Sequence, residues 1–111
     1  MKSRKHILQD LIRINGNTDI LEIELSQFSW DSEKELVTVN NKDLINAITK
    51  CISNEIKFDE LVRWANIIEC RDDIGFKHEV TKELIHEIAN PKINGLNEKR
   101  LVDIVNELTI L

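Results

Sequence analysis

Apolar residues recur every three or four positions along most of the chain, which is the spacing of one face of an amphipathic α-helix. Six such stripes can be traced, at residues 7–12, 20–28, 44–52, 61–68, 80–89 and 101–108. Residues that cap or break helices separate them: Gly16, Asn40, Gly75, Asn90 with Pro91, and Asn97. The pattern predicts an all-α fold, with residues 1–111 forming one compact domain of about six short amphipathic helices.

Residues 18–28 and 30–39 fit the helical pattern less well. In the first stretch, Leu21, Ile23 and Leu25 also alternate at a period of two, as they would in a strand. A helix is preferred because helices flank this stretch and no second clear strand is visible, but a strand stays open. The second stretch is polar and then β-branched, which predicts a loop that ends in an extended piece.

The stripes also predict the hydrophobic core. Its expected members include Ile20, Trp64 and Val102. Cys51 and Cys70 also lie at core spacing and are expected to be reduced, inert thiols, although a disulfide between them stays open.

Composition and length indicate a soluble protein of the cytoplasm. The chain has 111 residues, of which 41% are apolar and 32% charged, as in globular domains. Asp10 and Arg13 interrupt the apolar stretch that a secretory signal would need after the basic start. No run approaches the roughly 18 apolar residues of a membrane span. With reduced cysteines, these features predict a cytoplasmic location.

Candidate catalytic and metal-binding residues are few. Glu83 and His86 form an E-x-x-H pair, the spacing found in di-iron carboxylate proteins, but no second pair accompanies it. We therefore expect a solvated helix face there. No phosphate-binding glycine motif occurs, and no nucleophile motif surrounds the three histidines, although a Cys–His pair formed by the fold stays open. We expect no enzyme activity, no metal and no cofactor.

The net charge of −5 is concentrated in one segment. Residues 16–37 contain six acidic side chains and a single lysine, so the rest of the chain sums to zero. An acidic segment with an aromatic anchor suits a basic partner, because charge steers the encounter and the aromatic residue supplies a hot spot. A solubility face with a core tryptophan is the alternative. The predicted partner-binding residues are Asp19, Glu22, Glu24, Trp30, Asp31, Glu33 and Glu35.

Two strings in the second half of the chain are distinctive. Residues 61–76 read LVRWANIIECRDDIGF, and residues 84–108 read LIHEIANPKINGLNEKRLVDIVNEL. The W-A-N-x-x-E-x-R-D-D-I-G-F and A-N-P-x-I-N-G patterns resemble CdiI-type immunity proteins of contact-dependent growth inhibition systems. The resemblance implies a small helical monomer that binds a cognate toxin domain one to one in the cytosol. It also implies that the toxin is a nuclease. Because the cleft of a nuclease holds a polyanion and is basic, we expect the acidic segment to occupy it.

The residues of these strings also have a structural interpretation. Arg71 can fork onto a carboxylate, and Asp72 or Asp73 can accept backbone N–H groups before Gly75. Both motifs are therefore expected to be scaffold, which leaves the acidic segment as the recognition surface, with no role for nucleic acid or membrane.

A second functional class starts from the first helix. Residues 1–15 carry four cations against Asp10. This helix could serve a small nucleic-acid-binding regulator of the antitoxin-like repressor type. The four cations are Lys2, Arg4, Lys5 and Arg13.

Overall fold

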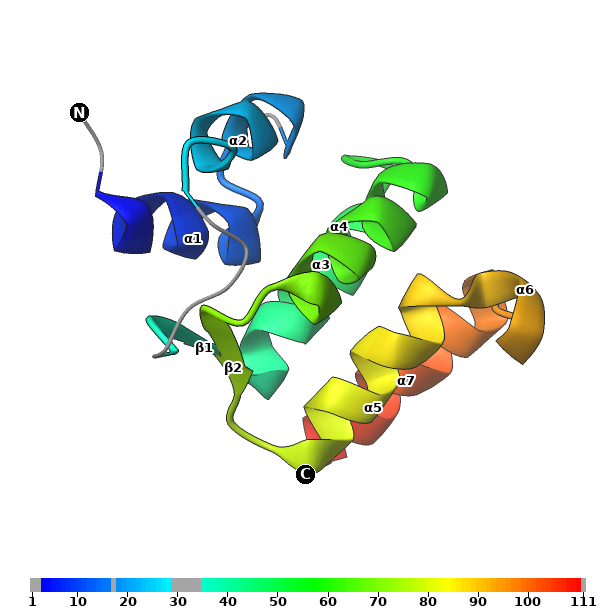
Figure 1. Cartoon of the computed structure of the whole chain (residues 1–111). Helices are drawn as coiled ribbons and strands as arrows, with labels where there is room; N and C mark the ends of the chain where they lie inside the picture. Colours follow the sequence, from blue (N-terminus) through cyan, green and yellow to red (C-terminus); the bar gives the residue numbers. More distant parts are fainter. Residues whose placement is uncertain (1–2, 17, 29–34, 111) are drawn as a thin grey trace.

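The computed structural model describes residues 3–16, 18–28 and 35–110, and its fold is the predicted all-α one. Among these residues, six helices of eight residues or more are joined by one four-residue helix and two short strands (Figure 1). The helices are α1 (Arg4–Arg13), α2 (Thr18–Leu25), α3 (Asn41–Ile52), α4 (Phe58–Cys70), α5 (Glu79–Ala89), α6 (Pro91–Asn94) and α7 (Glu98–Ile110). The open choice for residues 18–28 is thus settled in favour of a helix.

The helix boundaries follow from cap chemistry. The Asn40 side chain accepts the backbone N–H of Asp43, and the Asp43 carboxylate accepts that of Asn40, which closes a capping box at the start of α3. Asn97 caps α7 by accepting the N–H of Arg100. One stop differs from the expectation: α1 ends at Arg13 because Ile14 adopts a left-handed conformation with φ of 54°, two residues before Gly16.

The two strands form a small parallel sheet. β1 (Val37–Val39) is the predicted extended piece, and it pairs in register with β2 (Ile74–Phe76). The sequence prediction missed β2 and placed Gly75 in a turn. In the structure Gly75 is a buried strand residue, and the Glu35 carboxylate lies where a β-carbon of residue 75 would project. A three-residue strand is too short to display a period of two, and its partner lies 37 residues away.

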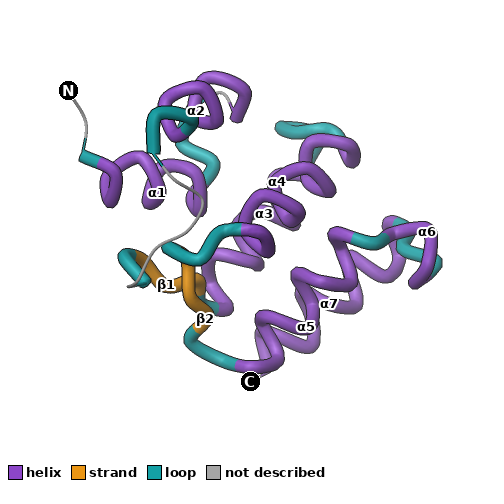
Figure 2. Tube along the Cα trace, viewed as in Figure 1, coloured by secondary structure: helices purple, strands orange, loops and turns teal. Residues whose placement is uncertain are grey.

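The sheet joins the two ends of the molecule. β1 packs against α1, and β2 packs against α5. Figure 2 shows the strands between the α1–α2 pair and the start of α5. Trp64 of α4 is fully buried, and its indole N–H donates to the Leu11 carbonyl oxygen of α1 at 2.9 Å. One hydrophobic core therefore extends from α1 to α7.

Some residues expected in the core lie outside it. Ile20 is 57% exposed and Val102 is 40% exposed. Cys70 is exposed at the end of α4, and Cys51 is half-buried; both thiols are free. A stripe of apolar residues does not by itself determine how the helix is rotated about its axis, so it does not decide which of its residues are buried. No helix among the described residues combines the length and apolar character needed to cross a membrane.

Candidate partner-binding surface

Helix α2 has an unusual division of its faces. Leu21 and Leu25 are buried, whereas Ile20 and Ile23 are 57% and 70% exposed. At 100° per residue, the two exposed isoleucines form a stripe that points away from the buried leucines. Carboxylates flank this stripe, with Asp19 and Glu22 on one side and Glu24 on the other. The outer face of α2 is therefore apolar in the middle and acidic at both margins.

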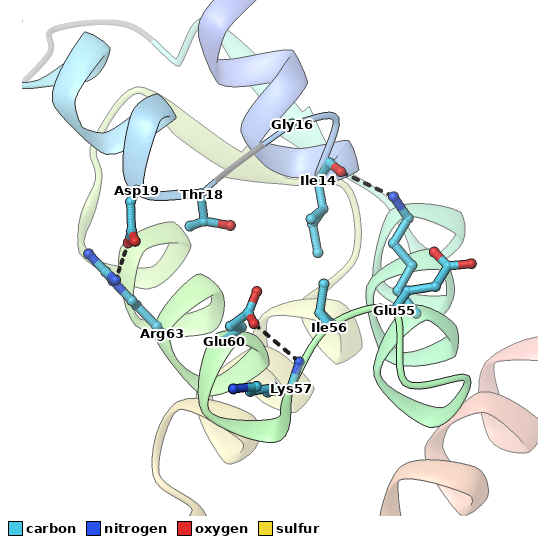
Figure 3. Close-up of a pocket in the computed structure, with 10 residues that line it drawn as sticks. Ile14, Gly16, Thr18, Asp19, Glu55, Ile56, Lys57, Glu60 and Arg63 are labelled. Carbon is cyan, nitrogen blue, oxygen red and sulfur yellow. Dashed lines mark hydrogen bonds and ion pairs between the residues drawn. The ribbon is translucent and has the colours of Figure 1, made fainter.

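Arg63 of α4 bridges to the acidic margin that faces it. Its Nε lies 3.0 Å from Oε1 of Glu22, and a terminal nitrogen lies 2.6 Å from Oε2. The other terminal nitrogen pairs with Asp19, as Figure 3 shows. Hydrogen bonding to Glu22 is the main cause that raises the pKa of Arg63. Because all three side chains are accessible to solvent, the pairing is screened and easily exchanged.

A polar hollow of about 520 Å³ lies beside this pairing, between the start of α2 and the connection from α3 to α4 (Figure 3). Its charged lining is balanced, and Lys50 donates to the Ile14 carbonyl oxygen at 3.1 Å. Thr18 supplies the only hydroxyl among the lining residues, and none of them is a histidine or cysteine. Among the described lining residues, no serine, cysteine or histidine is present from which a Ser–His or Cys–His pair could be built. The charged members are Asp19, Lys50, Glu55, Lys57, Glu60 and Arg63.

The predicted partner-binding residues fall into three groups. Asp19, Glu22 and Glu24 lie together on α2. Glu35 is exposed and lies two residues before β1, with its carboxylate over Gly75. The remaining three, Trp30, Asp31 and Glu33, lie outside the described residues. The structure therefore brings the first group into one surface and puts Glu35 at the sheet.

The R-D-D-I-G string is the buried counterpart of this surface. Arg71 forks onto Asp73, with Nε 2.9 Å from Oδ1 and a terminal nitrogen 2.9 Å from Oδ2. Arg4 of α1 adds a third contact, from its Nε to Oδ2 of Asp73 at 2.9 Å. The Asp73 side chain is fully buried, and that of Arg71 is 3% exposed. The expected fork of Arg71 is confirmed.

The prediction that the side chain of Asp72 or Asp73 accepts backbone N–H groups needs correction. The carboxylate of Asp73 accepts arginine N–H groups, while its backbone carbonyl accepts the N–H of Leu36 at 2.8 Å. Burial is the largest single influence on the pKa of Asp73 and opposes ionisation, but the hydrogen bonds from Arg71 and Arg4 outweigh it. The pKa therefore lies below its usual value. The string ties α1, β1, β2 and the end of α4 together.

The basic residues of α1 are divided by this arrangement. Arg4 is committed to Asp73, and its guanidinium lies over the Phe28 ring, 5.6 Å from the centroid. Lys5 and Arg13 are exposed on α1, and Lys2 lies outside the described residues. Two of the four cations of the predicted basic helix are thus seen at the surface.

The E-x-x-H pair lies on the exposed side of α5. The Nδ1 atom of His86 is 2.6 Å from Oε1 of Glu69 on α4, rather than directed at Glu83. Within residues 3–16, 18–28 and 35–110, no three histidine, cysteine, aspartate or glutamate side chains are grouped as metal ligands would be.

Two features of the surface were missed in the sequence. One is Arg63, which lies 41 residues beyond the glutamate that it binds, and no local pattern links them. The other is an open groove of about 760 Å³ between the first half of α4 and the α6 region. Of its apolar residues, only Val62 belonged to a predicted buried stripe, whereas Phe58, Pro91 and Leu96 were interpreted as a helix start, a helix stop and part of a turn.

Comparisons with models of protein families, with curated proteins and with solved structures found no match.

Proposed function

We propose that this protein is an immunity protein that binds and neutralises a cognate bacterial toxin domain in the cytosol. The toxin is a basic nuclease such as an RNase, and the immunity protein blocks its active-site cleft as a monomer in a one-to-one complex. The observation that carries the proposal is the outer face of α2, where Ile20 and Ile23 are exposed between carboxylates.

This face combines the two contributions that a protein interface needs. A partner that covers the two exposed isoleucines removes their apolar surface from water, and this favours association. The carboxylates at the margins attract a basic partner and accelerate its encounter. Nuclease clefts that hold a polyanion are basic, so an acidic face is complementary to them.

The buried charges support a division of the molecule into a scaffold and a separate recognition surface. Arg71 and Asp73 satisfy one another in the interior, so the most distinctive part of the resemblance to CdiI-type proteins acts as scaffold. An immunity family needs a constant scaffold and a surface that changes with the toxin. Helix α2 and the acidic residues up to Glu35 are suited to the second task.

The nucleic-acid-binding alternative receives less support. Arg4 neutralises Asp73, and α2, which carries three carboxylates, packs against α1. A DNA-binding regulator would need a dense cationic surface.

Protection of cells tests the proposal. We expect the gene immediately upstream to encode a large secreted protein with a toxic C-terminal domain; that domain is co-expressed with the chain, and growth is measured. We expect the wild type to restore growth, and Ile23→Lys to weaken protection and binding by at least tenfold. Ile110→Lys is the matched control because Ile110 is 86% exposed on α7. Equal protection by the two variants would place recognition elsewhere.

Charge reversal tests the acidic segment separately. Changing Asp31, Glu33 and Glu35 to lysine should leave the fold intact and weaken binding, more at low salt than at high salt. The same reversal at Glu98, Asp103 and Glu107 of α7 should have little effect. Two equally protective triple variants would contradict an interface in residues 16–37.

A further inference from the structure

The groove between α4 and α6 is a second apolar surface, distinct from the outer face of α2. It has a volume of about 760 Å³, within the range of ligand sites, and it is open along its length. Five apolar side chains line it, and three charged residues stand among them. The apolar residues are Phe58, Val62, Ile67, Pro91 and Leu96, and the charged ones are Asp59, Arg63 and Lys92.

The walls of the groove restrict what can occupy it. They are formed mainly by α4 and by the α6 turn, whose backbone groups are largely bonded within those elements. Gly95 closes α6 with φ of 62° and donates its N–H to the Pro91 carbonyl oxygen. Walls of this kind offer few backbone partners to an extended peptide. An α-helix satisfies its own backbone, so it can present apolar side chains to such a groove without that cost.

The charged residues around the groove indicate the sign of the charge on its occupant. Arg63 lines the groove and also pairs with Asp19 and Glu22, so the groove and the acidic margin of α2 meet at this residue. Across the joined surface, three carboxylates face two cations. The carboxylates are Asp19, Glu22 and Asp59, and the cations are Arg63 and Lys92. A partner that covers both parts is therefore basic on its polar side.

We propose that the groove binds the apolar face of a basic amphipathic helix. The proposal rests on the immunity function, because that helix belongs to the toxin domain. Residues Val62, Ile67 and Leu96 receive its apolar side chains, while its lysines and arginines extend towards α2 and compete with Arg63 for the carboxylates.

A probe peptide tests the groove without the toxin. The probe is a 14-residue helix with leucine on one face and lysine on the other, and a second peptide carries glutamate in place of each lysine. Binding to the full chain is measured by fluorescence anisotropy, and the contact residues are mapped by NMR of backbone amides. We expect the lysine peptide to bind and to shift the amides of Val62, Ile67 and Leu96, and the glutamate peptide to bind at least tenfold more weakly.

Two valines provide a matched pair of variants. Val62→Gln alters the groove, whereas Val102→Gln makes the same change on α7, where the valine is 40% exposed. Val62→Gln should weaken binding of the lysine peptide at least tenfold, and Val102→Gln should leave its binding unchanged. Equal affinities for the two variants, or amide shifts confined to α2, would overturn the proposal. Circular dichroism of both variants checks that the helices are retained.

The same variants separate this proposal from the immunity function. If Val62→Gln protects cells as well as the wild type does, the groove is not used and the immunity function stands. If the wild type binds the lysine peptide in the groove but gives no protection, the groove stands and its helix does not come from that toxin.

Discussion

Two arginine–carboxylate clusters of this protein share one chemistry and differ in their surroundings. In the first, Arg71 and Arg4 meet Asp73 in the interior. In the second, Arg63 meets Asp19 and Glu22 at the surface. Each contains an arginine that forks onto one carboxylate, but the Asp73 side chain is fully buried whereas that of Asp19 is 63% exposed.

The difference determines what each cluster can do. A buried charge has lost its hydration, so removing its partner leaves an ion that nothing compensates. The interior cluster is therefore fixed, and it holds α1 against β2. An exposed pair keeps most of its hydration and exchanges partners at little cost. The surface cluster thus remains available to the cations of another protein.

Breaking the interior cluster should have the largest effect. Asp73→Asn keeps the shape of the side chain but removes the buried negative charge that Arg71 and Arg4 both bind, so we expect the free energy of unfolding to fall by about 3–5 kcal/mol. Urea denaturation followed by circular dichroism measures it. The neighbouring Asp72 is exposed, and Asp72→Asn should change the stability little. Similar losses in both variants would contradict the assigned role of Asp73.

A cluster of intermediate burial should give an intermediate, pH-dependent effect. Glu87 of α5 accepts two hydrogen bonds from Arg100 of α7, at 2.7 and 3.0 Å, and this pairing lowers the pKa of Glu87. Because the folded state binds the proton more weakly, the stabilisation is present above the ordinary glutamate pKa of about 4.3 and is lost as the pH falls through the lower folded value.

Comparison of the wild type with Glu87→Gln measures this contribution. The difference in unfolding free energy should be at most about 1 kcal/mol at pH 7 and should shrink in acid below pH ~4. Urea titrations at several pH values follow it. A difference that stays constant into strong acid would show that the ionised pair is not its source.

The surface cluster should give the smallest change in stability. Arg63→Gln is expected to leave urea denaturation unchanged, because the pair is exposed. Its effect should appear in binding: the variant removes the positive charge beside Glu22 and Asp19, so a basic partner should associate faster and with a steeper dependence on salt. Stopped-flow kinetics with the lysine peptide measures this. Arg100→Gln, which disrupts the cluster on α7, is the control and should not accelerate association.

The sequence predicted the features that arise from local chemistry. Helical periodicity located the helices, and the caps of Asn40 and Asn97 follow from side chains three residues from the N–H groups that they bind. Trp64 was correctly placed in the core. These features depend on neighbours in the chain, so a single sequence is enough to find them.

Features that depend on distant contacts were not predictable. Strand β2 is defined by its pairing with β1, and Arg4 reaches Asp73 across 69 residues. The exposure of Ile20 has the same origin, because the stripe of α2 is compatible with more than one rotation of the helix. The acidic segment was found as a property of the sequence, but Arg63 and the groove depend on how α2, α4 and α6 are brought together.

The hydrogen bond between Trp64 and Leu11 gives the protein an internal optical reporter. The indole is shielded from water only while α1 stays packed against α4, since its N–H donates to a carbonyl oxygen of α1. Replacing Trp30 by phenylalanine leaves Trp64 as the sole tryptophan of the chain. A red shift of its emission in mild denaturant, before the far-ultraviolet signal of the helices is lost, would then record α1 detaching ahead of the rest of the fold.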